Sequence, residues 1–154
     1  MAGRVICMYE LSNPVGRGAA NTSRGDVMLI QYFLFSIYLG TRFITPFELL
    51  DATLNLGALV PTNGTFTDDL VRWIVTFQQD ANQKGFGPIV ADGRIDPGKA
   101  AWGIRQGRST NHRTIMALNQ VLVNADRDAF ERLTDPQMPT ELRSLLSVAN
   151  SRGL

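Results

Sequence analysis

The chain reads Asp26-Val27-Met28-Leu29-Ile30-Gln31-Tyr32-Phe33-Leu34 over one apolar segment and Trp73-Ile74-Val75-Thr76-Phe77-Gln78 over a second. Apolar residues of the first segment recur three and four positions apart, the spacing of one face of a helix. They are Val27, Ile30, Phe33, Leu34, Ile37 and Tyr38. In the second segment the same pattern joins Leu70, Trp73, Ile74 and Phe77. Two helices, each with a buried face, are therefore predicted.

Residues that favour helix ends frame both segments. Ser23 suits the N-cap of the first helix, and Asp26 places a carboxylate near the positive end of its dipole. Gly40 can terminate that helix. Thr67 can cap the second helix, whose first turn carries two aspartates, and we expect its last turn to fray near Lys84.

The remaining sequence indicates shorter elements. Arg4 to Leu11 is a β-prone run, which predicts an edge strand or an arm that pairs with a neighbouring chain. Val15 to Gly25 is typical of a loop, and Pro46 favours a short helix from Phe47 to Leu56. Residues 86–107 predict a loop with short β pieces. Further helices are expected over Asn111 to Asn124, Asp126 to Leu133 and Thr140 to Ala149.

Composition and charge argue against several classes of function. The chain has 154 residues, of which 44% are hydrophobic and 19% charged, and this composition fits one folded domain. A net charge of +1 argues against nucleic acid or an anionic membrane as the partner. Cys7 is the only cysteine, so neither an intrachain disulfide nor a zinc site built on several thiolates can form.

The two apolar segments resemble the peptidoglycan-binding-like domain, a small non-catalytic helical module of cell-wall hydrolases and other wall-directed proteins. The family pattern runs Asp-Val-x-x-Val-Gln-x-x-Leu, then Asp-Gly-x-Phe-Gly-x-x-Thr-x-x-Ala-Val-x-x-Phe-Gln. This chain matches the first part at Asp26, Val27, Ile30, Gln31 and Leu34. It matches the second part at Gly64, Phe66, Ile74, Phe77 and Gln78.

A later stretch extends the resemblance, and several positions depart from it. Asp92-Gly93-Arg94-Ile95-Asp96-Pro97-Gly98, followed by Thr114 and Leu118-Asn119, is similar to an extension present in some members. The departures are Asn63 for Asp, Thr67 for Gly, Leu70 for Thr and Trp73 for Ala. A Trp in place of an Ala changes a helix contact substantially.

The resemblance covers residues 14–124 and implies a mainly α fold, a small helical bundle with long loops. Within that domain, residues 41–62 would be an insertion. Residues 1–13 would form the β-prone arm, and residues 125–154 would add C-terminal helices. The family implies binding of wall glycan or stem peptide in a groove. The candidate contacts are Gln31, Asn63, Thr65, Thr67, Gln78, Asp92, Arg94 and Asp96.

Several of these candidate residues also have a purely structural interpretation. Arg94 is suited to pair with a peptide carboxylate. Gln31 and Gln78, in contrast, can satisfy backbone groups of neighbouring loops. Asp92 can close a turn on Gly93. Both interpretations stay open at the level of the sequence.

Catalytic motifs are lacking. His112 is the only histidine, so a His-Glu-x-x-His metallopeptidase site is excluded, and Gly-x-Ser-x-Gly is absent. A small wall hydrolase would need an acidic carboxyl, usually with a second carboxylate. Of the four glutamates, only Glu10 lacks an obvious role at a helix start or on a helix surface. We therefore predict a protein without catalytic activity, metal or cofactor.

Delivery and partners follow from the same features. No segment reaches the ~18–20 apolar residues of a membrane helix, and no ordinary secretory signal is visible at the N-terminus. We expect delivery to the cell wall by a phage particle or an injection machine. The alternative hypothesis is a structural subunit of a phage tail or contractile injection apparatus that keeps the fold without wall binding.

Overall fold

The computed structural model describes residues 9–47, 62–98 and 112–151, with side chains described up to residue 146. The prediction of a mainly helical protein is confirmed, because these residues form five helices and one small two-stranded sheet. The helices are α1 (Arg24–Tyr38), α2 (Asp68–Gln83), α3 (His112–Ala125), α4 (Arg127–Arg132) and α5 (Thr140–Ser151). The strands are β1 (Val15–Gly16) and β2 (Arg94–Ile95).

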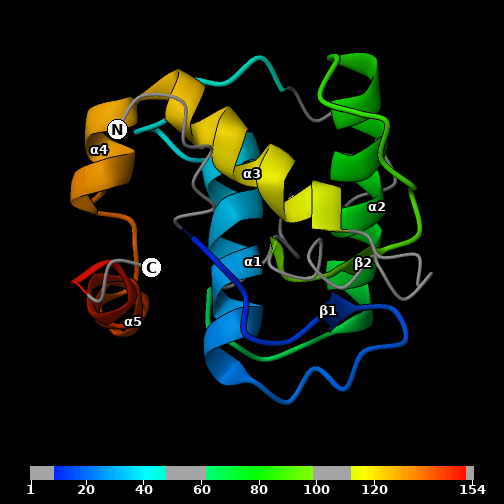
Figure 1. Cartoon of the computed structure of the whole chain (residues 1–154), viewed down its shortest axis with the longest axis horizontal. Coiled ribbons are helices and arrows are strands. Elements are labelled where there is room, and N and C mark those ends of the chain that lie inside the picture. Colours follow the sequence, from blue (N-terminus) through cyan, green and yellow to red (C-terminus); the bar gives the residue numbers. More distant parts are fainter. Residues whose placement is uncertain (1–8, 48–61, 99–111, 152–154) are drawn as a thin grey trace.

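Helix α1 is the centre of the fold (Figure 1), and it contacts α2, α3, α5 and β1. Every residue from Asp26 to Leu34 is buried, as expected for a helix that is enclosed on all sides. The predicted start is confirmed, since the Asp26 backbone N–H donates to Ser23 Oγ at 3.4 Å. The helix ends where the N–H groups of Leu39 and Gly40 both donate to the Phe35 carbonyl.

Helix α2 follows the predicted pattern closely. Leu70, Trp73, Ile74 and Phe77 are all buried, which confirms the expected apolar face. The helix ends at Gln83, beside the expected limit at Lys84. Thr67 occupies the N-cap position, but its side chain makes no capping hydrogen bond.

The strand prediction for Arg4 to Leu11 is wrong where the structure describes it. Residues 9–11 have no strand, and β1 instead lies within the segment expected to be a loop. The Asn119 side chain accepts the Tyr9 N–H at 3.0 Å and donates to the Tyr9 carbonyl at 3.1 Å. These are the hydrogen bonds that a neighbouring strand would otherwise make. Val15 is 1% exposed and pairs antiparallel with Ile95, which gives β1 a buried partner.

One hydrophobic core joins the N-terminal and C-terminal parts of the described chain. Tyr9 stacks on Phe130 of α4, with ring centroids 4.1 Å apart, and its hydroxyl donates to the Phe130 carbonyl. Leu142 and Leu146 of α5 belong to the same core. Helix α4 follows its N-cap Asp126, whose Oδ1 accepts the Ala129 N–H at 3.0 Å. The expected helix from Phe47 to Leu56 lies almost wholly outside the described residues.

Candidate binding site

Gln31 holds the turn that precedes α2. Its Oε1 accepts the Gly64 N–H at 2.7 Å, and its Nε2 donates to the Thr65 carbonyl at 2.9 Å. Nε2 also lies 3.3 Å from Asn63 Oδ1. Gln31 is only 2% exposed, so its amide group is turned into the protein and serves to fix the turn.

Gln78 does the same for the turn that precedes β2. Its Oε1 accepts the Gly93 N–H at 2.9 Å, and its Nε2 donates to the Arg94 carbonyl at 3.0 Å. Nε2 also contacts Asp92 Oδ1 at 3.4 Å and Thr114 Oγ1 at 3.1 Å. Gln78 is fully buried and therefore links α2, the turn and α3.

The two turns are structural repeats of one another. Gly64 and Gly93 both have a φ of +76°, a left-handed conformation that favours glycine. Asn63 Oδ1 accepts the Thr65 N–H at 2.9 Å, and Asp92 Oδ1 accepts the Arg94 N–H at 3.0 Å. In each case a helical glutamine thus clamps an Asx-Gly turn. The first residue of the turn is an amide, Asn63, in one case and a carboxylate, Asp92, in the other.

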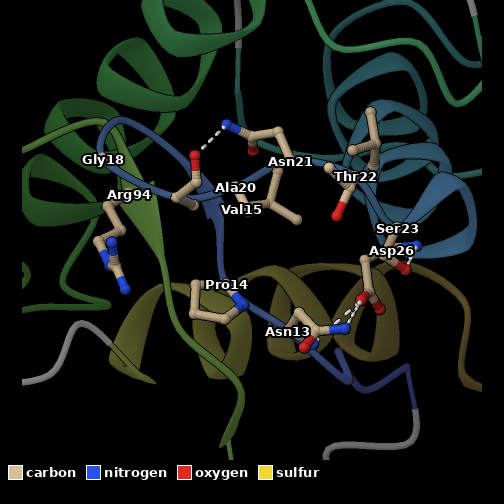
Figure 2. A pocket seen from close by; sticks show the side chains of 12 residues that line it. Asn13, Pro14, Val15, Gly18, Ala20, Asn21, Thr22, Ser23, Asp26 and Arg94 are labelled. Carbon is tan, nitrogen blue, oxygen red and sulfur yellow. Dashed lines mark hydrogen bonds between the residues drawn. The ribbon is translucent and has the colours of Figure 1, made fainter.

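The loop of residues 13–23 borders a first pocket of about 250 Å³. Figure 2 shows Arg94 at one edge of this pocket, and Asn13 with Asp26 at the other. Asn21 shapes the loop, because its side chain accepts the Gly16 N–H at 2.8 Å and donates to the Gly16 and Ala19 carbonyls. Asn21 itself has a φ of +56°, which fixes a sharp change of direction.

Arg94 is held in place at the edge of the first pocket. Its Nε donates to Asp96 Oδ1 at 3.1 Å, and Asp96 is buried. Its Nη1 lies 3.6 Å from the point that a Cβ at Gly18 would occupy. The guanidinium group therefore rests against the outer side of the loop.

A second pocket, of about 480 Å³, lies on the other side of the loop. Gly18, Ala19 and Asn21 line both pockets, so the two are neighbours. The second pocket is also lined by Gly16, Arg17, Phe66, Asp68, Val71 and Arg72. It combines two arginines, one aspartate and an apolar wall.

Arg17 is anchored to the β2 turn. Its N–H donates to the Gly93 carbonyl at 2.9 Å, and its guanidinium carbon lies 3.6 Å from where a Cβ at Gly93 would be. Gly16 allows this approach, since a Cβ there would come within 2.1 Å of the Gly93 carbonyl oxygen. No ion pair joins Arg17 to a carboxylate of the described chain.

In the described residues, the predicted contacts form two groups, one at the turn of Asn63 and one at the turn of Asp92. Only Arg94 lines either of these two pockets. Asn63, Thr65 and Thr67 are exposed around the first turn, where Arg24 of α1 donates to the Asn63 carbonyl. Gln31, Gln78, Asp92 and Asp96 are instead engaged in the internal bonds described above.

Sequence reasoning missed Arg17, Asn21, Phe66 and Arg72 as pocket residues. The available signal was weak: Arg17 stands between two glycines, and Asn21 follows a run of small residues. Their placement depends on the contact between the loop and the β2 turn, which is remote in sequence and has no local pattern.

The carboxylates considered for catalysis have structural roles where they are described. Glu10 Oε1 accepts the N–H groups of Leu11 and Gly98, both at 2.8 Å. Glu131 and Glu141 form exposed ion pairs with arginines, and Glu48 lies outside the described residues. Across residues 9–47, 62–98 and 112–151, no three His, Cys, Asp or Glu side chains are grouped closely enough for a metal ion.

Two buried tyrosines, Tyr9 and Tyr32, and the half-buried Tyr38 have carboxylates near them. Burial raises the pKa of Tyr9, Tyr32 and Tyr38 well above the ordinary tyrosine value. Asp135 adds to this rise for Tyr9 and Tyr32, and Asp80 adds to it for Tyr38. Tyr32 donates to Asp135, and Tyr38 donates to Asp80, so both hydroxyls act as protonated donors.

Comparison of the chain with protein-family models, curated proteins and solved structures found no match. Among the helices in the described parts of the chain, none has the length and apolar character needed to cross a membrane.

Proposed function

We propose that this protein is a non-catalytic cell-wall-binding module, delivered by a phage particle or an injection machine, whose ligand occupies the two pockets beside the loop of residues 13–23. The observation that carries the proposal is the pair of neighbouring pockets. They share Gly18, Ala19 and Asn21, and an arginine lies on each side. Two adjoining pockets suit a chain-like ligand that spans both better than a compact ligand that fills one.

The Gln78 clamp supports this proposal because it makes the site rigid. It fixes Gly93 and Arg94, and these residues in turn support Arg17 through the Gly93 carbonyl. A site that is already ordered loses little conformational entropy when it binds. The choice of a cell-wall ligand rests on the sequence resemblance of the α1 and α2 segments to the peptidoglycan-binding-like pattern.

Co-sedimentation with purified peptidoglycan sacculi, followed by turbidity of the same suspension, tests this function. We expect the protein to pellet with sacculi while turbidity stays constant. Protein that remains in the supernatant, as a control protein of similar size does, would exclude wall binding. A steady fall in turbidity would show wall cleavage and exclude a non-catalytic role.

A second candidate function is a structural subunit of a phage tail or contractile injection apparatus. Two exposed apolar side chains favour it: Ile44 is 87% exposed and Leu39 is 39% exposed, both in the segment after α1. Exposed apolar side chains can take part in protein contacts. A photo-crosslinking residue at position 44, compared with one at exposed Arg127, tests this in the producing cell. A specific adduct with another subunit at position 44 alone would support assembly, and equal labelling at both positions would count against it.

A further inference from the structure

We propose that the two pockets recognise a carboxylate-bearing peptide, the stem peptide of the wall, and not its glycan strand. This inference rests on the proposed function and specifies the ligand of the same site. It follows from the charges on the two sides of the loop and from the position of the aromatic rings.

Arg17 provides the first carboxylate site. It is exposed, and its backbone is tied to Gly93, so its position is set by the fold. The described chain supplies no carboxylate partner for it. Phe66 and Val71 line the same pocket and offer an apolar wall for the methyl and methylene groups of a peptide. Guanidinium groups pair with carboxylates through charge-assisted, directional hydrogen bonds.

Arg94 lies on the opposite side of the loop, where its Nε donates to Asp96 Oδ1 at 3.1 Å and its Nη1 is directed toward Gly18. Its Nη1 lies 3.6 Å from the Cβ position of Gly18, so the two arginines flank a stretch of small residues. Gly18 has a φ of +77°, which disfavours any larger residue there. A peptide that crosses Gly18 would meet one guanidinium on each side. Asp68 also lines the second pocket and adds a carboxylate there.

The aromatic residues argue against sugar as the main contact. A neutral sugar ring packs best on an exposed flat aromatic face. In the described chain, Trp73, Tyr9 and Tyr32 are buried in the core. Tyr38 is half-buried and donates to Asp80, and only the half-buried Phe66 lines either pocket. The pockets therefore offer charge more than stacking surface.

An NMR titration of the isotope-labelled protein with soluble stem peptide tests this directly. We expect the amide signals of Gly16 and Gly18 and the Nε–H signals of Arg17 and Arg94 to shift. The Arg17→Gln variant should weaken binding roughly five- to tenfold. Arg127→Gln, which removes an exposed arginine of α4, should leave binding unchanged. Absence of shifts, or equal shifts with a peptide whose carboxylates are amidated, would overturn the inference.

A parallel sedimentation separates this inference from the proposed function. Sacculi are compared before and after an amidase removes their stem peptides. Binding to intact but not stripped sacculi supports both proposals. Equal binding to both preparations would keep wall binding but overturn the peptide assignment. No binding to either would overturn the proposed function, while the titration still decides whether the pockets bind the peptide.

A separate observation concerns Asn63-Gly64, the only Asn-Gly pair in the chain. We infer that Asn63 is a deamidation site and that Gln31 slows its deamidation in the folded protein. In the reaction, the Gly64 nitrogen gives its proton to water and attacks Asn63 Cγ. The new N–C bond forms, the Cγ–Nδ2 bond breaks, and the departing nitrogen takes a proton from water and leaves as ammonia. Water then opens the succinimide ring to aspartate or isoaspartate. Glycine favours the ring closure because it has no Cβ to obstruct the approach.

Both reacting groups are restrained by one side chain. Gly64 N–H donates to Gln31 Oε1 at 2.7 Å, and Asn63 Oδ1 is held by Thr65 N–H and by Gln31 Nε2. The ring therefore closes only after the clamp opens. An aspartate product fits the turn, because Asp92 makes the corresponding contacts with Gln78 and with the Arg94 N–H. An isoaspartate lengthens the backbone and breaks this arrangement.

Mass spectrometry of the peptide that contains Asn63, after incubation in mildly alkaline buffer, tests the inference. We expect Gln31→Ala to deamidate several-fold faster than the wild type and to approach the rate of the denatured chain. Gln78→Ala, which destabilises the other turn, controls for general unfolding and should react more slowly than Gln31→Ala. Equal rates in the wild type and Gln31→Ala, or in both variants, would overturn the protective role of Gln31.

Discussion

Replacement of Gln78 by alanine should destabilise the protein strongly. Gln78 makes four hydrogen bonds over 2.9–3.4 Å, to the Gly93 N–H, the Arg94 carbonyl, Thr114 Oγ1 and Asp92 Oδ1. Because Nε2 has only two N–H donors for its three acceptors, these contacts amount to about three full hydrogen bonds, and at about 1 kcal/mol each their loss is about 3 kcal/mol. Gln78 itself is fully buried, and its bonds to the Gly93 N–H and Thr114 Oγ1 are buried too, so leaving these two partners without a hydrogen bond adds to the loss.

The measurement is the free energy of unfolding from urea titrations followed by circular dichroism. We expect Gln78→Ala to lose about 3–5 kcal/mol, a large part of the total stability of an ordinary domain. Its exposed neighbour provides a matched control, and Gln79→Ala should change the free energy by no more than about 0.5 kcal/mol. If the two variants differed by less than about 1 kcal/mol, the assignment of Gln78 as the clamp of the β2 turn would be refuted.

Three further predictions concern the other clamp and the buried tyrosines. Gln31→Ala should cost only about 1–2 kcal/mol in the same urea titration, since the Asn63 turn is exposed and water can replace the lost bonds; a loss equal to that of Gln78→Ala would contradict this. Tyr32→Phe should cost about 1–3 kcal/mol, because buried Asp135 loses a donor; a neutral effect on the melting temperature would argue against that bond. Stability should also fall as pH rises above about 10, because folding raises the pKa of Tyr9, Tyr32 and Tyr38 and the unfolded state releases their protons first. Melting temperatures across the alkaline range check this, and Tyr32→Phe should show a shallower fall than the wild type.

The helices could be predicted from the sequence because their signals are local. The three- and four-residue spacing in α1 and α2 marks the faces that the core buries, and Ser23 marks the start of α1. The short strand β1 could not be predicted, because it exists only where Gly16 meets the turn at Gly93. The predicted strand at Tyr9 is likewise absent because the Tyr9 backbone bonds to the side chain of Asn119, which is far away in the sequence.

The candidate site was predictable only in part, for a similar reason. The resemblance singled out Arg94 and the two glutamines, and all three lie at or beneath the β2 turn or its counterpart before α2. Arg17 and Asn21 become pocket residues only when the loop of residues 13–23 folds against that turn. No periodicity or spacing in the loop carries this information.

The most direct test of wall binding through the two pockets is a saturation isotherm on purified sacculi. It compares the wild type with a variant that carries both Arg17→Gln and Arg94→Gln, after circular dichroism has shown that both are folded. We predict saturable binding by the wild type, no loss of turbidity, and binding by the variant that is weaker by at least about tenfold. Wild-type protein that stays in the supernatant, or a variant that binds as tightly as the wild type, would contradict this account of the site.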